Sequence, residues 1–193
     1  MPSFPTSPED LTSPTILPSP STSQEWWDAL KHRPEQLLAW LLDQYRGEAT
    51  AAERIERLRD AYGAEPRAQR VLTVIADQER KHAGWVGGLL RTRGVDPIVS
   101  DKQDRYWKRA LPGVQDFETG CAVGAHAERM RLERIEVIAA DPDTPEDIRG
   151  VFTRILPEER FHERAFRTLA GARALEATRG AHALGRQALG LAP

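Results

Sequence analysis

The pattern Glu-x-x-His occurs twice in this sequence, at positions 80 residues apart. The first copy is Glu79 with His82, and the second is Glu159 with His162. Both copies lie in long stretches with the apolar spacing of an α-helix, on which residues three apart share one face. In each copy the carboxylate and the imidazole can therefore bind the same ion.

The residues around the two copies repeat in the same register. After a shift of 80 positions, VLTVIADQERKH at 71–82 aligns with VFTRILPEERFH at 151–162 without a gap. An earlier segment, EATAAERIERL at 48–58, aligns in the same way with ERMRLERIEVI at 128–138. Helical sequences share composition, but one register that holds across two separate segments is not expected by accident. The chain is therefore interpreted as a duplicated helix hairpin.

Helices are the only secondary structure that the sequence predicts. Apolar periodicity, prolines at helix starts and glycines at helix ends predict a short helix at 25–32, four long helices at 34–63, 65–94, 115–140 and 145–170, and a shorter one at 171–190. Only about three residues separate the first two long helices, so these helices must be antiparallel neighbours. Thr144 is expected to cap the fourth long helix, with Pro145 in its first turn. The predicted fold class is all-α, a four-helix bundle with short N-terminal and C-terminal helices.

The regions outside the long helices have distinct compositions. Residues 1–24 contain six prolines and six serines with little to bury, which predicts a disordered tail. Residues 25–193 are expected to form a single domain. The polar segment at 95–120, with a short helix expected at 104–111, is long enough to carry the chain across the bundle from one hairpin to the other.

Composition excludes several classes of function. The formal net charge is only −2, so the basic excess that nucleic-acid binding requires is missing. No apolar run approaches the roughly 20 residues needed to cross a bilayer. The single cysteine, Cys121, excludes an intramolecular disulfide and any cysteine-based zinc or iron knuckle. Because no basic residue precedes Lys31, a secretion signal is not predicted, and we expect a cytoplasmic protein.

Counting residues along each hairpin selects the carboxylates that face the two Glu-x-x-His patterns. Glu48 lies about 15 residues before the turn of its hairpin, and Glu79 lies about 13 residues after it, so both reach the same height at 1.5 Å per residue. Glu53 is only about ten residues from that turn and is several Å too low. The same count in the second hairpin favours Glu128 over Glu133. Glu48 and Glu128 are therefore the predicted partners.

Four carboxylates and two imidazoles are thus predicted to converge inside the bundle. Four carboxylates without counter-charge would be prohibitive in an apolar interior, whereas two divalent cations would neutralise them. A carboxylate-rich site with one imidazole per metal suits iron or manganese better than zinc, which more often takes additional His or Cys ligands. Iron is the first expectation and manganese the alternative.

A Glu from each of two helices and Glu-x-x-His from each of two others resembles the signature of the ferritin-like di-iron carboxylate superfamily. The resemblance covers residues 35–170 and is closest to rubrerythrin-like and small hydroxylase-like members. It implies a ferritin-like bundle in which Glu79 and Glu159 bridge two metal ions. It implies further that one ion takes Glu48, Glu79 and His82, and the other takes Glu128, Glu159 and His162.

Two departures from rubrerythrins set expectations for electron supply. Rubrerythrins carry a cysteine-based iron–sulfur module, which a chain with one cysteine cannot build. They also use an extra Glu one turn after the ligand of the third long helix, where this chain has Arg129, Met130 and Arg131. Electrons are therefore expected from an external donor such as a separate reductase, or from the iron itself.

Several further residues lie near the predicted metal ions. Tyr45 is one turn before Glu48 and could hydrogen-bond a ligand or carry a radical; a plain core tyrosine is the alternative. Cys121, Gly124 and Ala125 are small where the first hairpin is bulky, which predicts a pocket for dioxygen, peroxide or substrate. The alternative is that these small residues only permit close helix packing.

The resemblance implies a di-iron oxidoreductase that reacts with dioxygen or hydrogen peroxide, and it leaves open whether an organic substrate is then oxidised. Two other functions remain: a ferroxidase or iron-handling protein, and a manganese catalase-like enzyme. No membrane partner is expected. The five tryptophans are expected to pack the bundle ends or the face of a homodimer.

Overall fold

The computed structural model describes residues 22–62, 65–99, 105–189 and 191, and regular structure within these ranges is entirely helical. The predicted tail at 1–24 lies outside the described residues except for Thr22, which caps the first helix, and Ser23 and Gln24, which begin it. The helices are α1 (Ser23–Lys31), α2 (Pro34–Ala61), α3 (Pro66–Arg91), α4 (Arg105–Ala110), the 3₁₀ turn η1 (Leu111–Gly113), α5 (Phe117–Ala140) and α6 (Glu146–Ala188).

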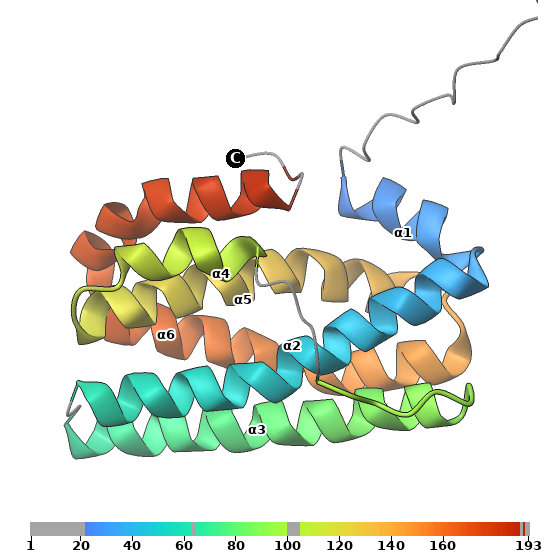
Figure 1. Cartoon of the computed structure of the whole chain (residues 1–193), viewed down its shortest axis with the longest axis horizontal. Coiled ribbons are helices and arrows are strands. Elements are labelled where there is room, and N and C mark those ends of the chain that lie inside the picture. The colour runs from blue at the N-terminus through green and yellow to red at the C-terminus, as the bar shows by residue number, and fades with distance from the viewer. Residues whose placement is uncertain (1–21, 63–64, 100–104, 190, 192–193) are drawn as a thin grey trace, which may run out of the picture.

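The four long helices form a bundle of two antiparallel hairpins. Helix α2 packs along α3, and α5 packs along the first part of α6 (Figure 1). The hairpins meet through contacts of α3 with α6 and of α2 with α5. Helix α4 lies in the connection between the hairpins, whose residues 100–104 are outside the described part. This arrangement confirms the predicted all-α bundle.

Helix α6 contains a sharp reversal at Gly171. The backbone there has φ 71° and ψ 166°, a conformation that glycine adopts without steric cost. The segment after Gly171 turns back and lies along α4 (Figure 1). A separate shorter helix was predicted to begin at this residue, and the structure has one.

Thr144 does not cap α6, which corrects the prediction from sequence. Pro145 occupies the position before the first helical residue, and no side chain caps this end. The Thr144 side chain is instead buried, where it accepts a hydrogen bond from Trp27 Nε1 at 2.9 Å and donates one to the Ile138 carbonyl at 2.9 Å. Thr144 therefore ties α1 to the end of α5.

Two of the three apolar clusters in the described core lie on either side of a polar layer, and the third, around Tyr106, Ala110 and Val123, joins α4 to α5. One cluster surrounds Trp27, Leu41 and Phe152, and the other surrounds Ile75 and Phe166. The sequence positions between these residues on the long helices carry the two Glu-x-x-His patterns and their partners. The apolar clusters shield this layer from water at both ends. None of the described helices combines the length and hydropathy needed to span a bilayer.

Candidate metal centre

Each of the four long helices contributes buried acidic side chains to the polar layer. Helices α2 and α5 contribute one carboxylate each, and α3 and α6 contribute a carboxylate and an imidazole each. All six residues are 5% exposed or less: Glu48, Glu79, His82, Glu128, Glu159 and His162. We call these six residues the metal centre.

The metal centre divides into two overlapping sets of four residues whose ligand atoms lie within 4.8 Å of one another. One set is Glu48, Glu79, His82 and Glu159, and the other is Glu79, Glu128, Glu159 and His162. Glu79 and Glu159 belong to both sets. The geometry therefore suits two cations that share these two carboxylates.

One atom of every residue in the metal centre is buried and has no hydrogen-bond partner among the described residues. These atoms are Glu48 Oε1, Glu79 Oε1, His82 Nδ1, Glu128 Oε2, Glu159 Oε2 and His162 Nδ1. His82 Nδ1 lies 3.2 Å from Glu159 Oε1, and His162 Nδ1 lies 3.2 Å from Glu79 Oε1, but neither pair has hydrogen-bond geometry. Buried polar atoms are nearly always satisfied, so six orphans in one place fit a site for cations.

The two histidines are held from behind by residues that the sequence analysis missed. His82 Nε2 lies 2.8 Å from Glu158 Oε2, and His162 Nε2 lies 2.9 Å from Gln78 Oε1. When each Nε2–H donates to its partner, Nδ1 is left with the free electron pair that a metal ligand needs. Gln78 and Glu158 are themselves 80 residues apart, so each hairpin supports the histidine of the other. This repeat was the sequence signal that could have found them.

Arg131, also missed as a site residue, reaches into the metal centre from α5. Its Nη1 lies 2.9 Å from Glu48 Oε2, 3.2 Å from Glu79 Oε2 and 3.1 Å from Glu159 Oε1. Arg131 is three residues after Glu128, a spacing that puts both on one helix face. The guanidinium therefore supplies one positive charge to the carboxylates that the two sets share.

Burial and charge act unequally on the four carboxyl groups. Burial raises the pKa of Glu48 to about 8 and raises the pKa of Glu128 well above its usual value, although Arg131 opposes both shifts. Burial would also raise the pKa values of Glu79 and Glu159, but Arg131 and the nearby histidines outweigh it and lower both. One guanidinium thus keeps only part of this cluster ionised, and two divalent cations would neutralise all of it.

The pKa of His82 is also shifted. Burial alone would lower this pKa, but the carboxylates of Glu159 and Glu48 raise it to about 10. The site thus favours a positive charge at His82 Nδ1, where either a proton or a metal ion can supply it.

A family model described as Rubrerythrin matches residues 40–170. This range is more than half of the chain and includes the whole metal centre. The chain belongs to the rubrerythrin family. No curated protein and no solved structure gave a significant match. Rubrerythrin-family proteins typically bind two iron ions, so the family and the two overlapping sets favour the same kind of cofactor.

Tyr45, the candidate for a hydrogen bond to a ligand or for a radical, packs within the bundle of this rubrerythrin-family chain. The ring is half-buried against the apolar cluster around Trp27, and its edge lies close to Gly87 on α3. Within the described residues its hydroxyl makes no hydrogen bond to the metal centre. The core-tyrosine alternative is the one that the packing supports.

The prediction of a pocket beside Cys121, Gly124 and Ala125 is wrong. Cys121 and Ala125 are fully buried within the cluster around Phe166. At Gly124 an added Cβ would come within 3.0 Å of the Phe166 ring, so this ring fills the space that the missing side chain leaves. The small residues of α5 therefore allow close packing against α6.

His82 is supported by a charged carboxylate, Glu158, and His162 by a neutral amide, Gln78. This difference predicts that the two metal sites differ in affinity. Glu158→Gln should keep the contact to His82 but remove its charge, which makes the imidazole a weaker ligand. Affinity at one of the two positions should fall by about tenfold, a usual effect of changing such a partner. Competition with a chelator should show two metal-binding steps, of which only one has a lower affinity than in the wild type. Glu176→Gln, at an exposed carboxylate on α6, is the control, and equal affinities for Glu158→Gln and wild type would contradict the prediction.

Proposed function

We propose that this protein is a di-iron oxidoreductase that reduces dioxygen or hydrogen peroxide. The observation that carries the proposal is the pair of overlapping ligand sets, in which six buried atoms have no hydrogen-bond partner in the described part of the chain. Membership of the rubrerythrin family supports the same class of cofactor. Manganese remains the alternative metal.

In this proposal the metal centre holds two divalent cations. Glu48 and His82 would help to hold one ion, Glu128 and His162 would help to hold the other, and Glu79 and Glu159, which belong to both sets, would serve both ions. Four carboxylates carry four negative charges, which two divalent ions balance. The donor set of oxygen atoms with one imidazole per ion suits iron, because zinc sites more often use additional nitrogen or sulfur.

Bound ferrous ions would supply two electrons, one from each ion, to the oxidant. The residues of the chain hold these ions in place and exclude bulk water. Glu158 and Gln78 fix the ring orientation of the two histidines, so that each Nδ1 faces the shared carboxylates. The electrons for another cycle come from a donor outside these 193 residues, because the one cysteine, buried Cys121, cannot form an iron–sulfur site.

Arg131 and the cations would compete for the same three carboxylates. Its Nη1 occupies the region between Glu48, Glu79 and Glu159, where it lies within 3.2 Å of a carboxylate oxygen of each. Two divalent cations would bring four positive charges into the small volume that the guanidinium already occupies, and they would repel it. We infer that Arg131 stabilises the protein without metal and withdraws when the ions bind.

Stopped-flow mixing tests the proposed reaction. Protein loaded anaerobically with two equivalents of Fe(II) is mixed with hydrogen peroxide or with air-saturated buffer, and ferric absorption is followed. Oxidation should be faster than that of the same Fe(II) in buffer, and a reductant should allow repeated turnover. Oxidation at the rate of free Fe(II) would refute the proposal. Release of dioxygen from peroxide by manganese-loaded protein would favour the catalase-like alternative, and ferric ion released into a growing mineral would favour iron storage.

A further inference from the structure

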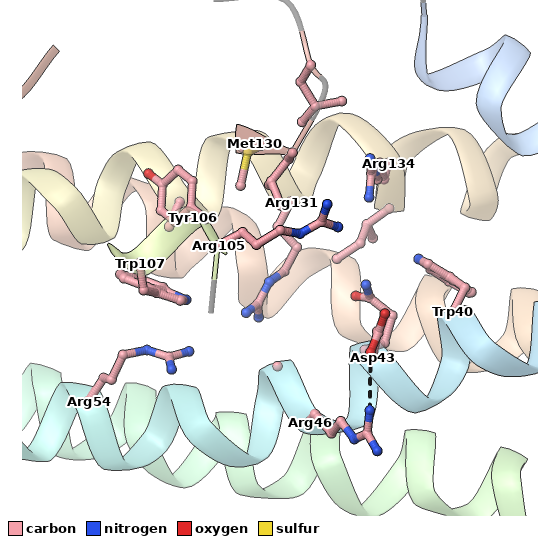
Figure 2. Close-up of a pocket in the computed structure, with 16 residues that line it drawn as sticks. Trp40, Asp43, Arg46, Arg54, Arg105, Tyr106, Trp107, Met130, Arg131 and Arg134 are labelled. Atoms are coloured by element: carbon pink, nitrogen blue, oxygen red, sulfur yellow. Dashed lines mark ion pairs between the residues drawn. The ribbon is translucent and has the colours of Figure 1, made fainter. Parts of the chain in front are cut away.

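A cavity of about 510 Å³ lies directly beside the metal centre. It is bounded by α2, α4, α5 and Leu189 and Leu191 near the end of the chain (Figure 2). Arg131 lines the cavity, and its Nη1 also lies 2.9 Å from Glu48 Oε2. This side chain therefore connects the cavity to the metal centre. The volume is within the range of about 300–1,000 Å³ that is usual for small-molecule sites.

The charge of the cavity is strongly one-sided. Of the described residues that line it, one is acidic, Asp43, and five are arginines: Arg46, Arg54, Arg105, Arg131 and Arg134. Asp43 is 3.5 Å from Arg46 and partly neutralises it (Figure 2). The chain as a whole is slightly acidic, with a formal net charge of −2, so this concentration of positive charge is a local feature.

Two of these arginines have no carboxylate partner among the described residues. Arg134 is half-buried and lies 4.5 Å over the ring of Trp26, and no described carboxylate lies within 4.0 Å of it. Burial lowers the pKa of its guanidinium, with only partial compensation from Glu133. Arg105 is exposed and likewise has no described ion pair. A half-buried cation without a nearby anion indicates room for an anionic ligand.

Most of the remaining lining residues are apolar, and three of them are aromatic. Tyr106, Trp107, Met130 and Ile135 line the cavity together with Trp40. The indole Nε1 of Trp40 is buried without a hydrogen-bond partner among the described residues, which leaves one donor for a ligand. Aromatic walls with a few polar groups are typical of sites that bind the flat body of a small organic molecule.

We propose that this cavity is the substrate site of the metal centre and that it takes a small organic anion with a flat apolar body. Arg134 and Arg105 hold the acidic group, and the aromatic walls contact the body. The proposal rests on the proposed oxidoreductase function. An anion within reach of Arg131 would also attract its guanidinium away from Glu48, Glu79 and Glu159, and would thereby assist binding of the cations.

Calorimetric titration of the full chain tests the proposal, with the metal-loaded and the metal-free protein in parallel. The probes are benzoate and phenyl phosphate, which differ in the acidic group, and benzyl alcohol, a neutral molecule of similar size. At least one of the two anions should bind at least tenfold more tightly than benzyl alcohol, and more weakly at high salt. Arg134→Gln and the exposed Arg105→Gln should each weaken binding by roughly tenfold. Arg164→Gln, at an exposed arginine away from the cavity, should change nothing.

Equal binding of the neutral probe, or wild-type affinity in both cavity variants, would overturn the proposal, as would no binding of either anion. Because Arg105 is exposed, its variant remains informative if Arg134→Gln fails to fold. Fe(II) oxidation is measured without any organic probe, so the two proposals can fail separately. Oxidation without anion binding refutes the substrate site alone. Anion binding without oxidation refutes the proposed function and, with it, the substrate role, and leaves only an anion-binding cavity.

Discussion

Glu159→Gln should leave the protein unable to hold two metal ions. Glu159 belongs to both ligand sets, and glutamine has the same shape but only one oxygen and no negative charge. Loss of a bridging carboxylate weakens both positions, and we expect an affinity loss larger than the tenfold to hundredfold that follows loss of an outer partner. Metal analysis after gel filtration should find fewer than two ions per chain. Glu79→Gln should behave in the same way, because Glu79 is its equivalent in the repeat.

Glu53→Gln is the matched control for these variants. Glu53 lies one and a half turns from Glu48 on α2, but its carboxylate is 62% exposed and pairs with Arg57 at 2.9 Å. Removing its charge should leave metal binding unchanged and cost little stability, because exposed ion pairs contribute little. Full loading of Glu159→Gln with two ions would contradict the ligand assignment.

Arg131→Met should have opposite effects on the protein without metal and on the loaded protein. Without metal, the variant removes the positive charge that lies within 3.2 Å of three buried carboxylates. Removing one partner of a buried ion pair typically costs about 3–5 kcal/mol, so the free energy of unfolding should fall by that order. Once the ions are bound, the guanidinium is a competitor. The loaded variant should therefore be at least as stable as loaded wild type and should bind metal more tightly.

Thermal unfolding with and without metal measures both effects. Arg129→Met is the control, because Arg129 is exposed, two residues away on the same helix and outside the metal centre. It should shift both midpoints equally and only slightly. Arg131→Met could instead weaken metal binding, as Glu159→Gln is expected to do. In that case the guanidinium would stabilise the metal-loaded centre, and the inference that it competes with the cations would be wrong.

The sequence predicted the bundle because its signals were local. The apolar periodicity of four long helices and the short connection within each hairpin fix the antiparallel pairs. The Ala- and Leu-rich composition of residues 171–190 predicted a separate shorter helix, and the structure has the break at Gly171 where this helix begins. Counting residues to the turn selected Glu48 over Glu53, and the structure brings Glu48 beside Glu79 while Glu53 faces solvent.

The errors arose where contacts between distant segments decide the outcome. Small residues on α5 are compatible with a pocket or with close packing, and Phe166, 42 positions after Gly124, fills the space. Thr144 has the sequence features of a helix cap, but Trp27 of α1 supplies a buried donor that binds its hydroxyl.

Arg131 was missed for a different reason. Its equivalent in the repeat is Ala51, so the duplication gave no indication of a functional role. The spacing from Glu128 indicates which face of α5 carries Arg131, but not how far the long side chain reaches. The cavity beside it needs three helices and the end of the chain, and no single segment of sequence predicts such a space.

An anomalous scattering map from crystals of the iron-loaded protein tests the central claim most directly. Two peaks are predicted, one beside Glu48 and His82 and the other beside Glu128 and His162, with Glu79 and Glu159 next to both. A single peak, or iron bound elsewhere while these side chains keep their contacts with Arg131, would contradict the dinuclear centre.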